Sequence, residues 1–419
     1  MKFKLLFILT VFCKVISSQT SSKKVLFLGN SYTAANNLPQ MVANIAASVN
    51  DTLIFDSNTP GGYTLSGHST NTTSLTKIGT GNWDFVVLQE QSQLPSFPDS
   101  QVEVEVFPYA KKLDSIINAE SSCAETVFYL TWGRKNGDAS NCSGWAPVCT
   151  YQGMDSLLSL RYRMMADSND AILSPVGAVW KYIRQNFPSI ELYQSDESHP
   201  SVAGTYAAAC AFYAVIFRKD PVSIPYNSTL SSVDAANIRS AAKIVVYDAL
   251  LQWHVGEYDP IANFGFSELN NGQIDFSNTS TNATDYYWDF GDGTTSTTEN
   301  PSHTYTANGN YLITLYANMC GITDSFQQTI LVTSVGIENI NKEELDIFIF
   351  PNPSTDIVNI TVGNKSLGST LFLKDVNGKV VFSKLLNSNS LSIHLELMQG
   401  VYFISTSKEP QKSLQLLIQ

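Results

Sequence analysis

The fold of this chain is decided by residues 25–31, which read Val-Leu-Phe-Leu-Gly-Asn-Ser. Four apolar residues followed by glycine predict a buried strand, and Ser31 lies at its carboxyl end. Ligands of parallel sheets bind at that end of the strands. A second segment, residues 196–200, reads Asp-Glu-Ser-His-Pro. Ser31, His199 and Asp196 together supply a nucleophile, a base and a residue that orients the base.

Over residues 23–258, short apolar runs alternate with longer amphipathic stretches. We expect strands at residues 25–28, 52–56, 85–88, 126–131 and 171–173. We expect helices at residues 38–49, 103–119, 154–166, 177–186, 202–217 and 232–254. This alternation predicts an α/β domain with a parallel sheet that helices cover on both faces.

The composition changes near Asp259. Residues 263–333 are rich in Thr, Asn, Ser, Tyr and Gly, with strand-like runs at residues 273–277 and 311–316, which predicts an all-β sandwich. Residues 345–419 form a third, strand-like unit. In this unit Asn377-Gly378 lies between two alternating runs and predicts a hairpin turn. Two small all-β sandwich domains therefore follow the α/β domain.

Length and charge narrow the class of protein. A chain of 419 residues exceeds one ordinary domain. The net charge of −12 disfavours nucleic acid and anionic membranes as partners and favours neutral ones such as sugars or uncharged esters. Residues 1–18 combine a basic start, an apolar run and small polar residues, which predicts a secretory signal peptide. No other run approaches the ~20 apolar residues of a membrane span, so we expect no transmembrane segment.

An exported protein meets an oxidising compartment, in which disulfides form. Cys142 and Cys149 bracket a short loop with a glycine and a proline, and we predict that they form a disulfide. Cys123 and Cys210 either pair with each other or remain buried thiols. We expect no metal site, because neither a histidine nor a second close cysteine pair accompanies these residues.

Further polar groups follow the second and third predicted strands. Gly62 can bring a backbone N–H close to an oxyanion. Gln89 and Gln91 carry carboxamide N–H groups, which are suitable oxyanion donors. Two aromatic residues remain open to two interpretations: His68 either faces the pocket or is a loop histidine, and Trp132 either lines the substrate cleft or belongs to the core.

In order and spacing, these blocks resemble the SGNH (GDSL-type) hydrolase family. Residues 29–31 stand where the family has Gly-Asp-Ser, and residues 196–199 stand for its Asp-x-x-His. Gly62 resembles the second block, with Gly61 as the alternative. The third block departs from the family's Gly-x-Asn-Asp and reads Gln-Glu-Gln-Ser over residues 89–92.

The register of the third block places Gln91 where the family has asparagine, and Gln89 is the alternative. The resemblance implies a flavodoxin-like, three-layer α/β/α fold and a secreted serine esterase that needs no cofactor. Its substrates would be acyl esters, acetylated polysaccharides among them, with lipid esters and thioesters also open. The rival hypothesis is a non-catalytic surface protein that binds glycan through a degenerate hydrolase domain.

The later domains carry resemblances of their own. Residues 287–294 read Tyr-Trp-Asp-Phe-Gly-Asp-Gly-Thr, which is similar to a PKD domain, a small immunoglobulin-like sandwich. The third unit begins with Phe-Pro-Asn-Pro at residues 350–353 and contains Gly-Val-Tyr at residues 400–402. It resembles the C-terminal sorting domain of the type 9 secretion system. This resemblance implies the type 9 secretion machinery as a partner, and a secreted or cell-surface protein.

Overall fold

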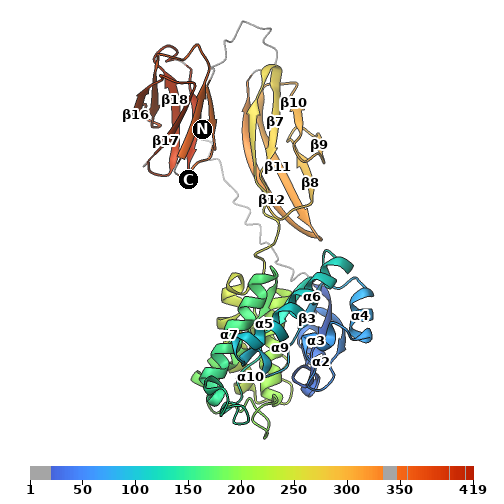
Figure 1. Cartoon of the computed structure of the whole chain (residues 1–419). Helices are drawn as coiled ribbons and strands as arrows, with labels where there is room; N and C mark the ends of the chain where they lie inside the picture. Colours follow the sequence, from blue (N-terminus) through green and yellow to red (C-terminus); the bar gives the residue numbers. More distant parts are fainter. Residues whose placement is uncertain (1–19, 334–346, 356, 396, 411) are drawn as a thin grey trace, which may run out of the picture. The chain divides into compact units, whose positions relative to one another are not determined.

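The computed structural model describes residues 20–333 and 347–419, apart from residues 356, 396 and 411. The signal peptide predicted over residues 1–18 lies outside the described residues. The first part of the chain combines strands with helices, whereas the later parts are built of strands (Figure 1). Among the described residues, every helix is too short or too polar to span a bilayer.

The first domain is built on one parallel sheet of five strands in the order β2-β1-β3-β4-β5. These strands are β1 (Ser22–Leu28), β2 (Thr52–Asn58), β3 (Phe85–Leu88), β4 (Glu125–Tyr129) and β5 (Ile172–Ser174). The predicted parallel sheet is therefore confirmed. Since β2 and β3 lie on opposite sides of β1, the chain reverses its direction across the sheet there. Such a switch point opens a crevice at the carboxyl ends of the strands, between β1 and β3.

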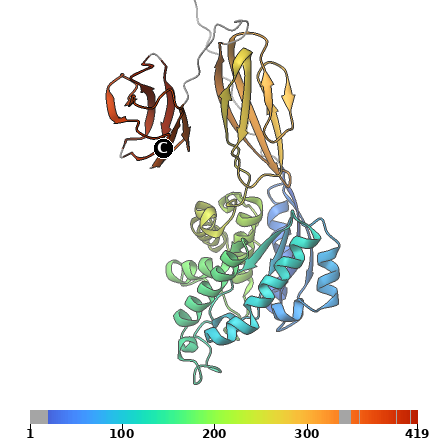
Figure 2. The ribbon, with the colours of Figure 1, turned by 45° about the horizontal axis from the view of Figure 1, so that its top comes forward.

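Helices cover both faces of this sheet (Figure 2), as the alternating pattern predicted. On one face lie α2 (Leu38–Ala47), α8 (Val176–Asn186), α9 (Val202–Phe217) and α10 (Ser232–Val245). On the other lie α4 (Thr72–Gly79), α6 (Phe107–Glu120) and α7 (Tyr151–Ser168). α9 is buried along nearly its whole length because α2, α8 and α10 all pack beside it.

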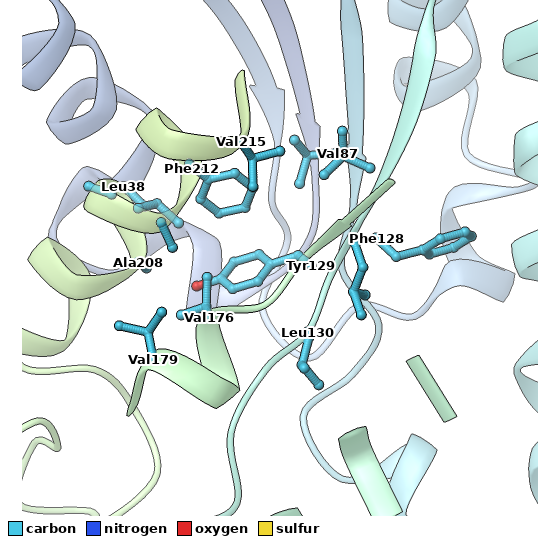
Figure 3. Packing of buried hydrophobic residues seen from close by; sticks show 14 of the residues in the cluster. Leu38, Val87, Phe128, Tyr129, Leu130, Val176, Val179, Ala208, Phe212 and Val215 are labelled. Atoms are coloured by element: carbon cyan, nitrogen blue, oxygen red, sulfur yellow. The ribbon is translucent and has the colours of Figure 1, made fainter. Parts of the chain in front are cut away.

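The core of the domain follows from the two-residue period of its strands. Phe128 and Tyr129 are neighbours in β4 and point to opposite faces of the sheet (Figure 3). Tyr129 meets Phe212 of α9 edge to face, with ring centroids 4.9 Å apart. The side chains of Phe128 and Tyr129 are both fully buried. A strand that is covered on both faces needs apolar residues at every position, which explains its continuous apolar run.

Two predicted helix boundaries are wrong. The helix expected at residues 103–119 is divided at Val106 into α5 (Asp99–Glu105) and α6, because Pro108 lacks an N–H and is tolerated only in the first turn of a helix. The helix expected at residues 232–254 ends at Val245 and is followed by a 3-10 helix, η5 (Tyr247–Trp253). The short helix α3 (Leu65–His68) and α4 were not predicted.

The strand-rich parts each contain two antiparallel sheets. The first has the orders β10-β7-β6 and β12-β11-β8-β9, and Phe264 and Phe276 of one sheet contact Trp288 of the other. Its strands are β6 (Phe264–Glu268), β7 (Gln273–Asn278), β8 (Asp285–Asp289), β9 (Thr295–Ser296), β10 (Ser302–Thr304), β11 (Gly309–Met319) and β12 (Ile322–Val332). This contact between sheets makes a sandwich, as predicted.

The last part has the sheet orders β13-β14-β17 and β16-β15-β18-β19, with one shared apolar core. The predicted hairpin at Asn377-Gly378 is confirmed, since it joins the paired strands β15 and β16, and Gly378 has a φ of +81°. The strands are β13 (Ile347–Phe350), β14 (Ile357–Val362), β15 (Thr370–Lys374), β16 (Val380–Leu385), β17 (Ser390–His394), β18 (Gly400–Thr406) and β19 (Leu414–Ile418).

The cysteines form two disulfides. The predicted bond between Cys142 and Cys149 is present. The suggested pairing of Cys123 with Cys210 is wrong, because Cys123 is bonded to Cys320 of the second domain. Cys210 is a buried free thiol in α9. Because Cys123 and Cys320 are 197 residues apart in sequence, no local pattern indicated that they are bonded.

Substitution of Gly204 by alanine should destabilise the first domain. A Cβ atom there would lie 2.3 Å from the carbonyl oxygen of Leu192 and 2.5 Å from the ring of Trp180. We expect Gly204→Ala to lower the free energy of unfolding in urea by about 1–3 kcal/mol or more. Gly79→Ala is the matched control, since its Cβ would make only an ordinary 3.7 Å contact. Equal stability of the two variants would contradict this packing.

Candidate active site

Three side chains form a hydrogen-bonded series at the carboxyl end of β1. Ser31 is the first residue after the turn that ends this strand, and its Oγ lies 2.8 Å from Nε2 of His199. Nδ1 of the same ring lies 2.5 Å from Oδ2 of Asp196. If Nδ1 carries the hydrogen, the ring donates to the carboxylate and Nε2 can accept the proton of the serine hydroxyl. Ser31 and His199, which are 168 residues apart in sequence, thus lie within hydrogen-bond distance of each other.

The loop that carries His199 is shaped by Asp196. Its Oδ1 accepts the backbone N–H groups of Ser198 and His199, both at 3.0 Å. Partial burial opposes ionisation of Asp196, but the hydrogen bonds from His199 and Ser198 outweigh it and hold the pKa of this carboxyl below its ordinary value. The side chain of Asp196 is therefore an anion across the neutral range.

A stack of three buried aromatic rings supports this loop. Trp132 lies between Tyr32, at a ring distance of 4.8 Å, and Trp180, at 3.6 Å, with nearly parallel planes. Nε1 of Trp132 donates to the carbonyl oxygen of Ser198 (3.1 Å), and the Tyr32 hydroxyl contacts Ser198 Oγ (2.6 Å). The edge of the Tyr32 ring meets His199. The stack thus fixes His199 beside Ser31.

Trp132 does not line a substrate cleft. Its side chain is fully buried, so the core interpretation is the correct one. His68 is fully buried as well, and its Nε2 lies 2.9 Å from the carbonyl oxygen of Gly29. Its Nδ1 lies 2.7 Å from Ser74 Oγ. Burial lowers the pKa of His68, and the neutral ring ties the turn before Ser31 to α4. The expectation that His68 faces the pocket is therefore wrong.

Gln89 has no hydrogen left for a substrate. Its Oε1 accepts the backbone N–H of Asn30 and the hydroxyl of Thr33, both at 3.0 Å. Its Nε2 donates to Asn30 Oδ1 and to the carbonyl oxygen of Glu90. The side chain is fully buried. The alternative in which Gln89 donates to the oxyanion is therefore excluded, and Gln89 instead ties the end of β3 to the turn that carries Ser31.

Gln91 is partly exposed and keeps a donor. Its Oε1 accepts the backbone N–H groups of Gln93 (2.8 Å) and Leu94 (3.0 Å), which fixes the orientation of the amide. Its Nε2 donates one hydrogen to Gln93 Oε1 at 3.0 Å. The second hydrogen has only a long contact of 3.5 Å with Ser92 Oγ. Of the two glutamines, only Gln91 can therefore offer an N–H to a bound ester.

The loop with Gly62 packs against the same turn. Asn30 Nδ2 donates to the carbonyl oxygen of Tyr63 at 2.9 Å, which brings the loop beside Ser31. Gly62 has a φ of +66°, whereas Gly61 does not have a positive φ. Only glycine adopts this backbone without strain. The conformational requirement for glycine is thus at position 62, in agreement with the predicted second block.

Two acidic residues of the site carried no signal in the sequence. Asp138 is buried after β4 and accepts hydrogen bonds from Gln93 Nε2 (2.5 Å), Asn141 Nδ2 (2.6 Å) and Arg134 Nη1 (3.0 Å). Although burial opposes it, these partners lower the pKa of Asp138. Because Gln93 also holds Gln91, Asp138 links the loops that follow β3 and β4.

The second acidic residue is Glu90, which is fully buried between Gln89 and Gln91. Burial raises the pKa of its carboxyl to about 8, against the hydrogen bonds from the N–H groups of Gln91 and Leu65. Among the described residues, no group of three or more His, Cys, Asp or Glu side chains is placed to hold a metal ion.

Comparisons with known proteins agree with the domain sequence. Residues 258–333 match the family model of the PKD domain. The second domain is a PKD domain. Residues 348–419 match the family model of the secretion system C-terminal sorting domain. The protein is therefore exported by the type 9 secretion system, and it is either secreted or attached to the cell surface. No curated protein matches the chain.

Solved structures of hydrolases are among the neighbours of part of the chain. A DUF4886 family protein from Bacteroides uniformis has 16% identity over 55% of this chain and 95% of that chain, with a TM-score of 0.47. An SGNH hydrolase candidate from Slackia heliotrinireducens has 25% identity over 46% of this chain and 97% of that chain, with a TM-score of 0.38. The PKD1 domain of the Vibrio cholerae metalloprotease PrtV has 38% identity over 18% of this chain and 96% of that domain, with a TM-score of 0.17.

The raised pKa of Glu90 predicts a pH-dependent stability. Between its ordinary pKa of 4.5 and about 8, the folded protein holds a proton that the unfolded chain has released. The free energy of unfolding should therefore fall as the pH rises through this window, by up to about 1.4 kcal/mol per pH unit from this group. Glu90→Gln should flatten that fall in urea titrations between about pH 5 and pH 8. Parallel curves for both proteins would contradict the shift.

Proposed function

We propose that this protein is an exported serine esterase. The observation that carries the proposal is the series Ser31 Oγ, His199 Nε2, His199 Nδ1 and Asp196 Oδ2, with successive contacts of 2.8 and 2.5 Å. A serine hydroxyl is a weak nucleophile, and a neutral imidazole at hydrogen-bond distance is the group that activates it. The position at the switch point between β1 and β3 supports a site that binds ligand there.

In the proposed reaction, Ser31 Oγ attacks the ester carbonyl while its proton moves to His199 Nε2. Asp196 stabilises the imidazolium that forms. His199 then donates the proton to the leaving alkoxide, and an acyl-serine remains. A water molecule, deprotonated by the same ring, attacks the acyl group and releases the acid and free Ser31. The backbone N–H groups of Ser31 and Gly62 and the amide of Gln91 are the proposed donors to the oxyanion.

The substrate class follows from charge and location. A protein with a net charge of −12 disfavours anionic substrates at long range. The sorting domain indicates export, so the proposed esterase would meet substrates outside the cell, such as polysaccharides with acetyl esters. We therefore propose neutral acyl esters as the substrates, with acetylated glycans as the first class to test.

Replacement of the nucleophile should abolish turnover and leave the fold intact. We expect Ser31→Ala to lower kcat on p-nitrophenyl acetate and on acetylated xylan by at least about 10³-fold. Ser48→Ala is the control, since Ser48 Oγ only donates to the carbonyl oxygen of Ile45 at the end of α2. Wild-type protein that binds the glycan without releasing acetate would favour the non-catalytic alternative.

Replacement of Gln91 and replacement of Gln89, the two glutamines after β3, should have different effects. Gln91→Ala should lower kcat by about 10²–10³-fold, because its donor acts on charge that develops in the transition state. Gln89→Ala should mainly lower the free energy of unfolding, because it leaves buried partners on Asn30 and Thr33 unsatisfied. Kinetics and urea unfolding of both variants test this assignment. A larger loss of kcat in Gln89→Ala at unchanged stability would overturn it.

A further inference from the structure

We propose that Glu90 is a positioning residue that holds the two proposed oxyanion elements, the Gly62 loop and Gln91, at a fixed separation. This proposal rests on the proposed function, because it assigns Glu90 a task in that reaction. The residue lies between the two glutamines of the third block, and its side chain is fully buried. It therefore cannot touch the substrate, and it acts through the two elements that it joins.

The two carboxyl oxygens of Glu90 bind two different loops. Oε2 accepts the backbone N–H of Leu65 at 3.1 Å, and Oε1 accepts the backbone N–H of Gln91 at 2.5 Å. Leu65 is the first residue of α3 and follows Gly62 by three positions. One planar group thus spans the loop after β2 and the loop after β3.

The backbone of Glu90 anchors that group. Its N–H donates to the hydroxyl of Tyr162 in α7 at 3.1 Å. Its carbonyl oxygen accepts from Asn30 Nδ2 at 3.3 Å and from Gln89 Nε2 at 2.5 Å. Asn30 directly precedes Ser31. The same residue is therefore fixed to the nucleophile turn through its main chain and to both oxyanion elements through its side chain.

No cation compensates the burial of this carboxyl among the described groups that act on it. Its partners are two backbone N–H groups, and the one side-chain charge that influences it is the like charge of Glu105 in α5. Such burial is unfavourable for stability. Each of the two carboxyl oxygens can accept, since the hydroxyl oxygen of the protonated form keeps a lone pair, whereas a carboxamide of the same shape accepts on only one atom. The buried carboxyl of Glu90 therefore fits a role in fixing the positions of the two loops that it joins.

The test uses the full chain with Glu90→Gln, which keeps the shape and leaves either Leu65 or Gln91 facing an amide NH₂. We expect kcat on p-nitrophenyl acetate to fall by about 10–100-fold with KM changed by less than about threefold, because displaced donors weaken transition-state binding selectively. Hydrogen exchange should accelerate at the amides of residues 62–65 and 91–93. Glu90→Asp, which is too short to reach both N–H groups, replaces this variant if Glu90→Gln does not fold.

Asp114→Asn is the matched control. Asp114 in α6 is also a buried carboxyl, and it accepts from Thr126 Oγ1 at 2.7 Å and from Asn118 Nδ2 at 3.0 Å. These two partners belong to α6 and β4 and not to the loops of the site. If both variants lose kcat in proportion to their loss of thermal stability, or if Glu90→Gln keeps the wild-type kcat, the positioning role is wrong. If wild type hydrolyses no ester, the proposed function fails. Unchanged hydrogen exchange at residues 62–65 and 91–93 would separately overturn the positioning role of Glu90.

Discussion

A buried hydrogen-bond network around Asn30 is the constraint on which the rest of the site depends. Its N–H donates to Gln89, and its Nδ2 donates to the carbonyl oxygens of Tyr63 and Glu90. The ends of β1, β2 and β3 are thus joined one residue before Ser31. Each buried polar group left without a partner costs about 1–3 kcal/mol. The asparagine is required here because an aspartate could not donate to two carbonyl groups.

A second support holds the loop that carries His199. The stacked rings of Tyr32, Trp132 and Trp180 lie beneath the loop of residues 194–199, and two hydrogen bonds from the stack reach Ser198. Tyr32 directly follows Ser31 in sequence and contacts His199 in space. The distance between Ser31 and His199 is therefore set by buried groups on both sides, an arrangement that would keep the geometry of the proposed reaction without reorganisation.

Local patterns in the sequence were sufficient for the strands and the parallel sheet of the first domain. Apolar runs with turn residues determine strands locally, and an Asp three residues before a His can bond to it within one loop. The roles of His68, Trp132 and Gln89 were not predictable in this way. Each of them makes a hydrogen bond to a partner 39 to 66 residues away. Burial then decides whether a polar ring or amide faces a ligand or the backbone. The disulfide between Cys123 and Cys320 joins residues that are 197 positions apart, so it was the hardest of these contacts to predict from local patterns.

The topology also separates the chemistry from the later domains. Ser31 follows the carboxyl end of β1, whereas Cys123 precedes the amino end of the parallel strand β4. The disulfide to Cys320 therefore attaches at the edge of the sheet opposite the nucleophile. The contacts that shape the site come from residues 29–199. Because parallel strands have two distinct ends, the disulfide and the series Ser31, His199 and Asp196 lie at opposite edges of the same sheet.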